Sequence, residues 1–116
     1  MITESQAVMM IRDELPANEL RHLQIKQLYE SMQVFANSVI HLGENGELKR
    51  FETQLMVSDR MYVEGNSQVK EVMEKVYISS LSHTLERKPE LLLMAKKILN
   101  AGLLNVMRHD QLANNP

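Results

Sequence analysis

The sequence predicts an all-α protein, a compact bundle of five or six helices with a central antiparallel helical hairpin. Apolar residues recur at spacings of three and four over most of the chain, and no useful length alternates with the period of two that a strand requires. The breaks between the apolar stretches carry helix-capping residues. With 116 residues, the chain is expected to form one domain, 1–116, with a frayed tail at 113–116.

The first two helices are predicted from their caps and apolar stripes. Thr3 and Gln6 have capping-box spacing, and Pro16 interrupts the following stripe, so a first helix is expected at 3–14. Asn18 can cap a second helix, the longest in the chain. Its apolar stripe contains Leu20, Leu23, Leu28, Met32, Phe35, Val39 and Leu42.

The clearest break is Gly-Glu-Asn-Gly at 43–46, where both glycines are expected to supply positive φ. A third helix is expected at 47–64, ending at Gly65 as a left-handed cap residue. Its loop to the next helix is very short. The third and fourth helices should therefore be antiparallel neighbours.

Three more helices complete the expected bundle. Asn66 or Ser67 can cap the fourth helix, Pro89 suits the first turn of the fifth, and Gly102 separates the fifth from the sixth. These helices are expected at 67–85, 89–100 and 103–112.

Composition excludes several classes of function. Thirteen basic and fifteen acidic side chains give a net charge of −2, which offers no bulk attraction to nucleic acid or to an anionic membrane. The charge is −4 over residues 1–66 and +2 over residues 67–116, which could favour packing within one chain or between two. The absence of cysteine excludes disulfides and thiolate metal sites.

Targeting and cofactor signals are also missing. The first fifteen residues have no basic segment, and the apolar run at 7–11 is too short for a signal peptide or a membrane span, so a cytoplasmic protein without membrane contact is expected. The Gly-Glu-Asn-Gly break lacks the lysine and hydroxyl residue of a phosphate loop. His22, His41, His83 and His109 never stand at the spacing of four that lets two imidazoles share a metal on a helix. No metal or cofactor is expected.

A polar cluster is expected near the third and fourth helices, either in the core or in a pocket. Asp59 falls close to the apolar centre of its helix, where a carboxylate needs a hydrogen-bond partner or a counter-ion. The candidate members are Asp59, Tyr62, Tyr77, Ser80 and His83.

Serine, histidine and aspartate together suggest a catalytic triad, but the hairpin argues against it. A turn at residues 65 and 66 sets Asp59 opposite Val72 and His83 opposite Leu48. The separation along the helix is then about 15 Å, far beyond a hydrogen bond. No catalytic residue is assigned.

Nine methionines are many for a chain of this size. Methionine commonly fills irregular cores and sometimes lines an adaptable binding groove, and core positions are expected for Met56, Met61, Met73, Met94 and Met107. The apolar faces are broad for so small a bundle. A second copy of the protein would bury them.

One stretch resembles a family of small uncharacterised bacterial all-helical domains. In that family a helix ends in an acidic residue and Gly-Asn, the next opens with Val-Lys, and a Ser-Leu-Ser stretch follows. The matching residues here are Glu64, Gly65, Asn66, Val69, Lys70, Ser80, Leu81 and Ser82. The resemblance implies an all-helical bacterial protein without an assigned activity.

The function expected from these observations is a protein-protein interaction or regulatory module, of the adaptor or immunity type, working as a homodimer and able to bind a protein partner. One alternative is a small-ligand-binding protein or enzyme with an inter-helix cavity near Asp59. The other is nucleic-acid binding, which would need one continuous surface stripe of basic residues. That stripe would contain Arg87, Lys88, Lys96 and Lys97.

Overall fold

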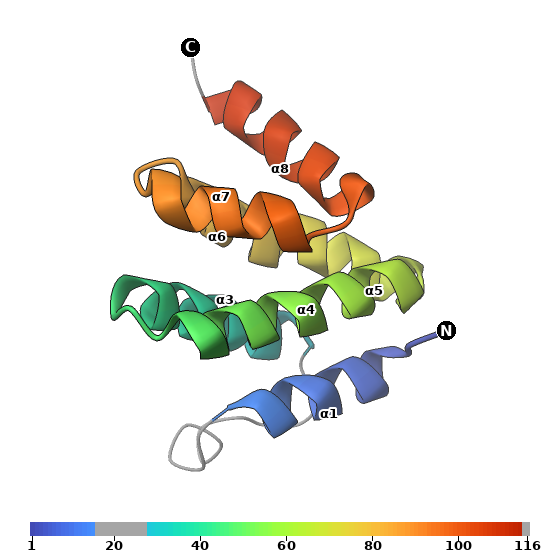
Figure 1. The fold of residues 1–116 in the computed structure, drawn as a ribbon. Coiled ribbons are helices and arrows are strands. Elements are labelled where there is room, and N and C mark those ends of the chain that lie inside the picture. Colours follow the sequence, from blue (N-terminus) through green and yellow to red (C-terminus); the bar gives the residue numbers. More distant parts are fainter. Residues whose placement is uncertain (16–27, 115–116) are drawn as a thin grey trace.

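Two layers of helices make up the protein in the computed structural model, which describes residues 1–15 and 28–114 (Figure 1). The all-α prediction is confirmed, since the described elements are helices and the one strand-like contact is a single bridge between Ile2 and Gly65. The elements are α1 (Glu4–Glu14), α3 (Leu28–Glu44), α4 (Leu48–Glu64), α5 (Ser67–Val72), η1 (Met73–Ile78), α6 (Ser79–Leu85), α7 (Pro89–Ile98) and α8 (Ala101–Asn114). The segments α5, η1 and α6 form one continuous helix with a π-helical turn in its middle.

The helices alternate between the layers. In Figure 1, α1, α4 and α7 lie in front, with α4 packed between the other two. Behind them, α3 packs against η1 and α6. At the top of the view, α8 packs on η1 and α6. The hairpins α3–α4 and α6–α7 are therefore stacked, so that their loops lie at the same end of the bundle.

The predicted helix starts are confirmed where local chemistry determines them. The Thr3 and Gln6 side chains make both bonds of a capping box. The Asn66 side chain accepts a hydrogen bond from the Val69 backbone N–H, and Pro89 occupies the first turn of α7. The early part of the predicted second helix, and the last two residues of the predicted tail, lie outside the described residues.

The central antiparallel hairpin is visible in two side-chain pairs. Ser58 meets Tyr77 and Tyr62 meets Glu74, so partner numbers fall along the second helix as they rise along α4. The sequence-based register set Asp59 opposite Val72, and in each observed pair the partner on the second helix lies about one helical turn further from the loop than that register predicts. Long side chains that lean toward the N-terminus of their own helix span that difference.

The expected conformation of Gly65 is wrong. Its φ is −70°, an extended conformation open to any residue. A glycine is required there for space, because a Cβ would overlap the Met61 carbonyl oxygen and lie 2.8 Å from Val69 Cγ1. The Ile2 backbone fixes this junction, accepting from Asn66 N–H at 2.9 Å and donating to the Glu64 carbonyl at 2.7 Å.

The expectation for the earlier glycines is half right. Gly46 has a φ of 75°, the left-handed conformation that glycine adopts at no steric cost. Gly43, by contrast, is buried within α3. A Cβ there would lie 2.9 Å from Leu91 Cδ1 and 3.1 Å from Phe51 Cε1, so Gly43 lets α3, α4 and α7 approach one another.

The core lies between the two layers. Phe35 of α3 stacks on Tyr77 with ring centroids 5.6 Å apart, a geometry that adds to the energy of burial. The methionines divide between core and surface. Met32, Met61, Met73 and Met107 are buried, Met10 and Met94 are partly buried, and Met1, Met9 and Met56 are exposed. None of the described helices combines the length and apolarity that crossing a bilayer requires.

Candidate functional site

Asp59 joins two helices. Its carboxylate accepts a hydrogen bond from the Asn100 backbone N–H, and the Asn100 side chain in turn accepts from the Gly102 N–H. The Asn100 carbonyl also accepts from the Leu104 N–H, so Asn100 is the residue at which α8 begins. Asp59 therefore holds the start of α8 against α4.

Tyr62 lies one turn further along α4 and points to the next helix. Its hydroxyl donates to the Glu74 carboxylate at 2.7 Å, and the Lys70 ammonium lies 5.9 Å from the centre of its ring. Partial burial, followed by the hydrogen bond with Glu74 and the charge of Glu74, raises the pKa of Tyr62 to about 12. Tyr62 is thus a protonated donor over the ordinary pH range.

Tyr77 is fully buried and faces Ser58. The Ser58 hydroxyl lies 2.5 Å from the Tyr77 hydroxyl and 2.8 Å from the Gln54 carbonyl oxygen. A serine hydroxyl has one proton and a carbonyl can only accept, so Ser58 donates to Gln54 and accepts from Tyr77. Burial raises the pKa of Tyr77 well above its ordinary value.

Ser80 and His83 lie elsewhere. Ser80 accepts a hydrogen bond from the Gln33 side chain at 3.3 Å, and His83 is exposed on α6. Asp59 and Tyr62 are near neighbours on α4, but the five candidate residues make their contacts in different parts of the bundle. None of them lines any of the three pockets described below.

The other chemical signals are equally dispersed. Within residues 1–15 and 28–108, no three histidine, aspartate or glutamate side chains gather as metal ligands would. The basic pairs expected for nucleic-acid binding lie at the two ends of α7. Lys88 borders a pocket that also contains Glu44 and Glu90, while Lys96 borders another with Arg108.

The distinctive feature of the surface is its apolar content. Seven large hydrophobic side chains are exposed among the described residues, and only Tyr29 lies outside the front layer. The other six are on, or directly before, α1, α4 and α7, which we call the α1–α4–α7 layer. They are Met1, Met9, Leu48, Met56, Val63 and Leu93. Single exposed apolar residues are ordinary, whereas six of these seven side chains belong to one layer.

A pocket of about 530 Å³ lies between α1 and α4 in this layer. Three of its lining side chains are methionines, and the Arg60–Glu64 ion pair forms part of its rim. Flexible thioether side chains can adapt to an apolar surface, and the charged rim can orient it. The lining residues are Met1, Ile2, Gln6, Met9, Met10, Asp13, Arg60 and Glu64.

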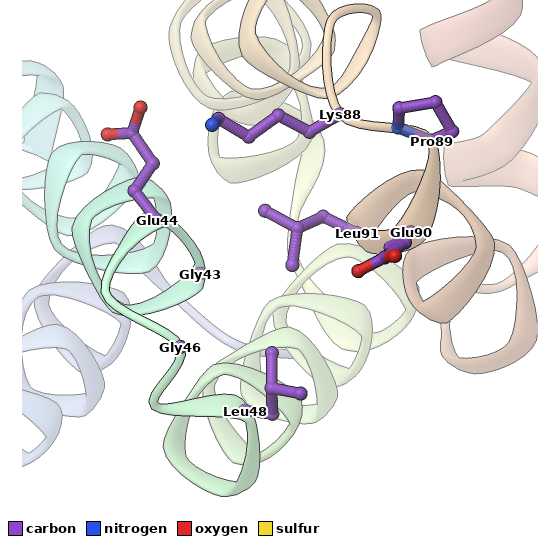
Figure 2. A pocket seen from close by; sticks show the side chains of 8 residues that line it. All are labelled: Gly43, Glu44, Gly46, Leu48, Lys88, Pro89, Glu90 and Leu91. Atoms are coloured by element: carbon purple, nitrogen blue, oxygen red, sulfur yellow. The ribbon is translucent and has the colours of Figure 1, made fainter.

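A second pocket of about 510 Å³ lies where the two stacked hairpin loops meet (Figure 2). Leu48 and Leu91 extend into it, and Lys88 reaches across its opening toward the α3 side. Glu44 and Glu90 complete a mixed-charge rim. A third, smaller pocket of about 200 Å³ lies between α7 and α8.

The sequence predicted broad apolar faces, but it did not locate them on the α1–α4–α7 layer. The expected core position of Met56 is wrong, since the residue is 58% exposed. Met56 and Val63 are seven residues apart, so they share a face of α4 opposite the buried residues, and this spacing was the available signal.

Fold and surface together define a class, a small two-layer helical domain with an apolar outer layer and dispersed polar groups. Residues 8–114 match the family described as a domain of unknown function (DUF7674), so the chain belongs to that family. The resemblance to an uncharacterised family is thereby confirmed. No curated protein and no solved structure matched the chain.

Proposed function

We propose that the protein is an interaction module that binds another protein through the α1–α4–α7 layer. The observation that carries this proposal is the location of six of the seven exposed large hydrophobic side chains of the described residues on that one layer. The stacked hairpins support it, because successive helices of such a stack present an extended surface.

The methionine-lined pocket between α1 and α4 is the proposed anchoring point. Its size suits one or two apolar side chains of a partner helix laid into the groove. Met9 stands at its edge with 60% of its surface exposed. A homodimer falls within the same proposal, since a second copy is one protein that the layer could bind. Cytoplasmic location and bacterial origin also belong to the proposal, supported by the absence of cysteine and by the family resemblance respectively.

A matched pair of variants tests this function. Met9→Lys places a charge at the groove, while Tyr29→Lys places one on the other layer at a residue equally exposed, 60%. Proteins captured from the source cells by the wild-type chain would be compared with those captured by each variant. We expect at least one protein that Tyr29→Lys retains and Met9→Lys loses, with at least about a tenfold loss of affinity when its binding is measured directly. Identical sets from all three chains would contradict the proposal.

A further inference from the structure

The outer side of α7 carries an ordered stripe of three exposed side chains, Glu90, Leu93 and Lys97. Their spacing of three and four places them on one face of the helix, opposite the buried Leu91 and Ala95. Leu93, at the centre, is 58% exposed. Neither Glu90 nor Lys97 forms an ion pair with another residue of the described ranges. An acidic end, an apolar centre and a basic end therefore face outward, and the two charged ends have no ion-pair partner among the described residues.

This stripe of charges is complementary to a second copy of itself on an antiparallel helix, because the acidic end of one then faces the basic end of the other. We propose that a second copy of this chain docks antiparallel on α7, related by a two-fold axis that passes between Leu93 and Met94. Glu90 then meets Lys97 of the partner subunit, and Lys97 meets Glu90 of the partner subunit. Leu93 packs across the axis. In such a two-fold symmetric contact the Glu90–Lys97 pair between subunits occurs twice, as a symmetric dimer requires.

The neighbouring helix fits the same axis. Asp59 of α4 contacts Asn100 just after α7, and Leu48 shares a pocket with Leu91, so the two helices run in parallel with Glu52 level with the centre of α7. Leu48 and Met56 lie about one helical turn on either side of Glu52. The two-fold axis that pairs α7 with itself brings Leu48 opposite the partner's Met56. Both are exposed in the single chain, 45% and 58% respectively.

A second copy is favoured over an unrelated partner because the complementarity lies within one stripe. A different protein would have to repeat the same sequence of charges in reverse, whereas a second copy presents it by symmetry. The net charge of −2 leaves little long-range repulsion between two copies. The inference rests on the proposed function, since it uses the α7 side of the same layer as a docking face.

Charge reversal provides the decisive test, with oligomeric state measured by analytical ultracentrifugation at about 100 μM, where dimers of micromolar Kd are populated. In Glu90→Lys, lysine meets lysine at both symmetric contacts, and in Lys97→Glu, glutamate meets glutamate. Each single variant, measured by itself, should therefore be monomeric. The double variant Glu90→Lys with Lys97→Glu should dimerise as the wild type does. A mixture of the two single variants should also dimerise, because opposite charges then meet at both contacts.

Disulfide trapping gives a second readout that does not depend on charge. The chain has no cysteine, so Leu93→Cys introduces the only thiol. Under mild oxidation it should form a covalent dimer far faster than Tyr29→Cys, the matched control on the other layer, because the proposed axis holds the two thiols close. Circular dichroism would verify that the substituted chains, all changed at exposed residues, remain folded.

Three results would overturn the inference. They are a wild-type chain that stays monomeric at these concentrations, a dimer that tolerates both single reversals, and a mixture that remains monomeric. Binding of a different protein through Leu93 would likewise mean that the second copy is not the occupant. None of these results bears on the Met9 comparison, so failure of the dimer and failure of the proposed function are separable.

Discussion

The Tyr77 hydroxyl lies 2.5 Å from the Ser58 hydroxyl at the centre of the bundle, where both side chains are fully buried. Tyr77 stands in the π-helical turn η1, and three consecutive residues of that turn, 76–78, are buried. A buried tyrosine needs a partner for its proton. Ser58 supplies it because its own proton is already given to the Gln54 carbonyl.

This arrangement predicts an asymmetry between two substitutions. Tyr77→Phe removes the donor and leaves Ser58 bonded to Gln54, so unfolding free energy should fall by about 1 kcal/mol. Ser58→Ala leaves the Tyr77 proton buried without an acceptor and should cost more, about 1–3 kcal/mol. Urea unfolding of both single variants and the double variant measures the coupling. If Tyr77→Phe costs more than Ser58→Ala, the donor assignment is wrong.

Asp59 should matter most at the start of α8. Asp59→Ala removes the acceptor of the Asn100 N–H, and we expect a loss of about 1–2 kcal/mol together with faster hydrogen exchange at that amide. Asp59→Asn keeps a carbonyl oxygen at the same place and should cost less. Exchange at the Tyr77 amide, in the other part of the hairpin, is the internal reference. Equal acceleration at both amides would mean that Asp59 contributes only to global stability.

How far the sequence determines this protein depends on whether a feature is local. The capping box of Thr3 and Gln6, the Asn66 cap and Pro89 at the start of α7 were predictable, because each uses residues within one turn of the helix end. The all-α fold was predictable from apolar spacing because that spacing is also a pattern within short stretches of sequence. The partner of Asp59 was not predictable, since Asn100 lies 41 residues away and offers only a backbone N–H.

The surface position of Met56 and Val63 follows from periodicity and packing together. The two residues share their face of α4 with charged side chains such as Lys49 and Arg60, and the packing of α1 and α7 on either side of α4 leaves that face outward. The role of Gly65 depends on a close approach of its own helix and of the Ile2 backbone, neither of which the Gly-Asn dipeptide encodes. Such features depend on the tertiary structure.

Two glycine-to-alanine substitutions distinguish the cost of steric overlap from the cost of an unfavourable backbone conformation. Gly65→Ala should be the more damaging, by about 2 kcal/mol or more, because its methyl group would meet the Met61 carbonyl and Val69. Gly46→Ala has open space around it and suffers only the strain of a positive φ, about 1 kcal/mol. Thermal and urea unfolding would rank the two variants. A Gly65→Ala protein as stable as Gly46→Ala would show that the junction at Ile2 can relax.

Tyr62 should make the protein sensitive to alkaline pH. Its pKa is raised in the folded state to about 12, from an ordinary value of 10.0, chiefly by burial and then by Glu74. The unfolded chain therefore loses this proton first. The stabilising contribution of Tyr62 is complete below pH 10 and disappears as pH rises toward 12. Unfolding free energy measured by urea titration should fall across this window.

Two variants assign that fall to Tyr62. In Tyr62→Phe the decline should be shallower but still present, because the buried Tyr77 also has a raised pKa. Glu74→Gln keeps an acceptor for the Tyr62 hydroxyl but removes the negative charge, which lowers the folded-state pKa of Tyr62. The decline should still begin near pH 10, but the part due to Tyr62 should end at a lower pH and be smaller than in the wild type. Tyrosinate absorbance of the folded chains would follow the titration directly. A decline identical in the wild type and Tyr62→Phe would place the alkaline sensitivity on another group.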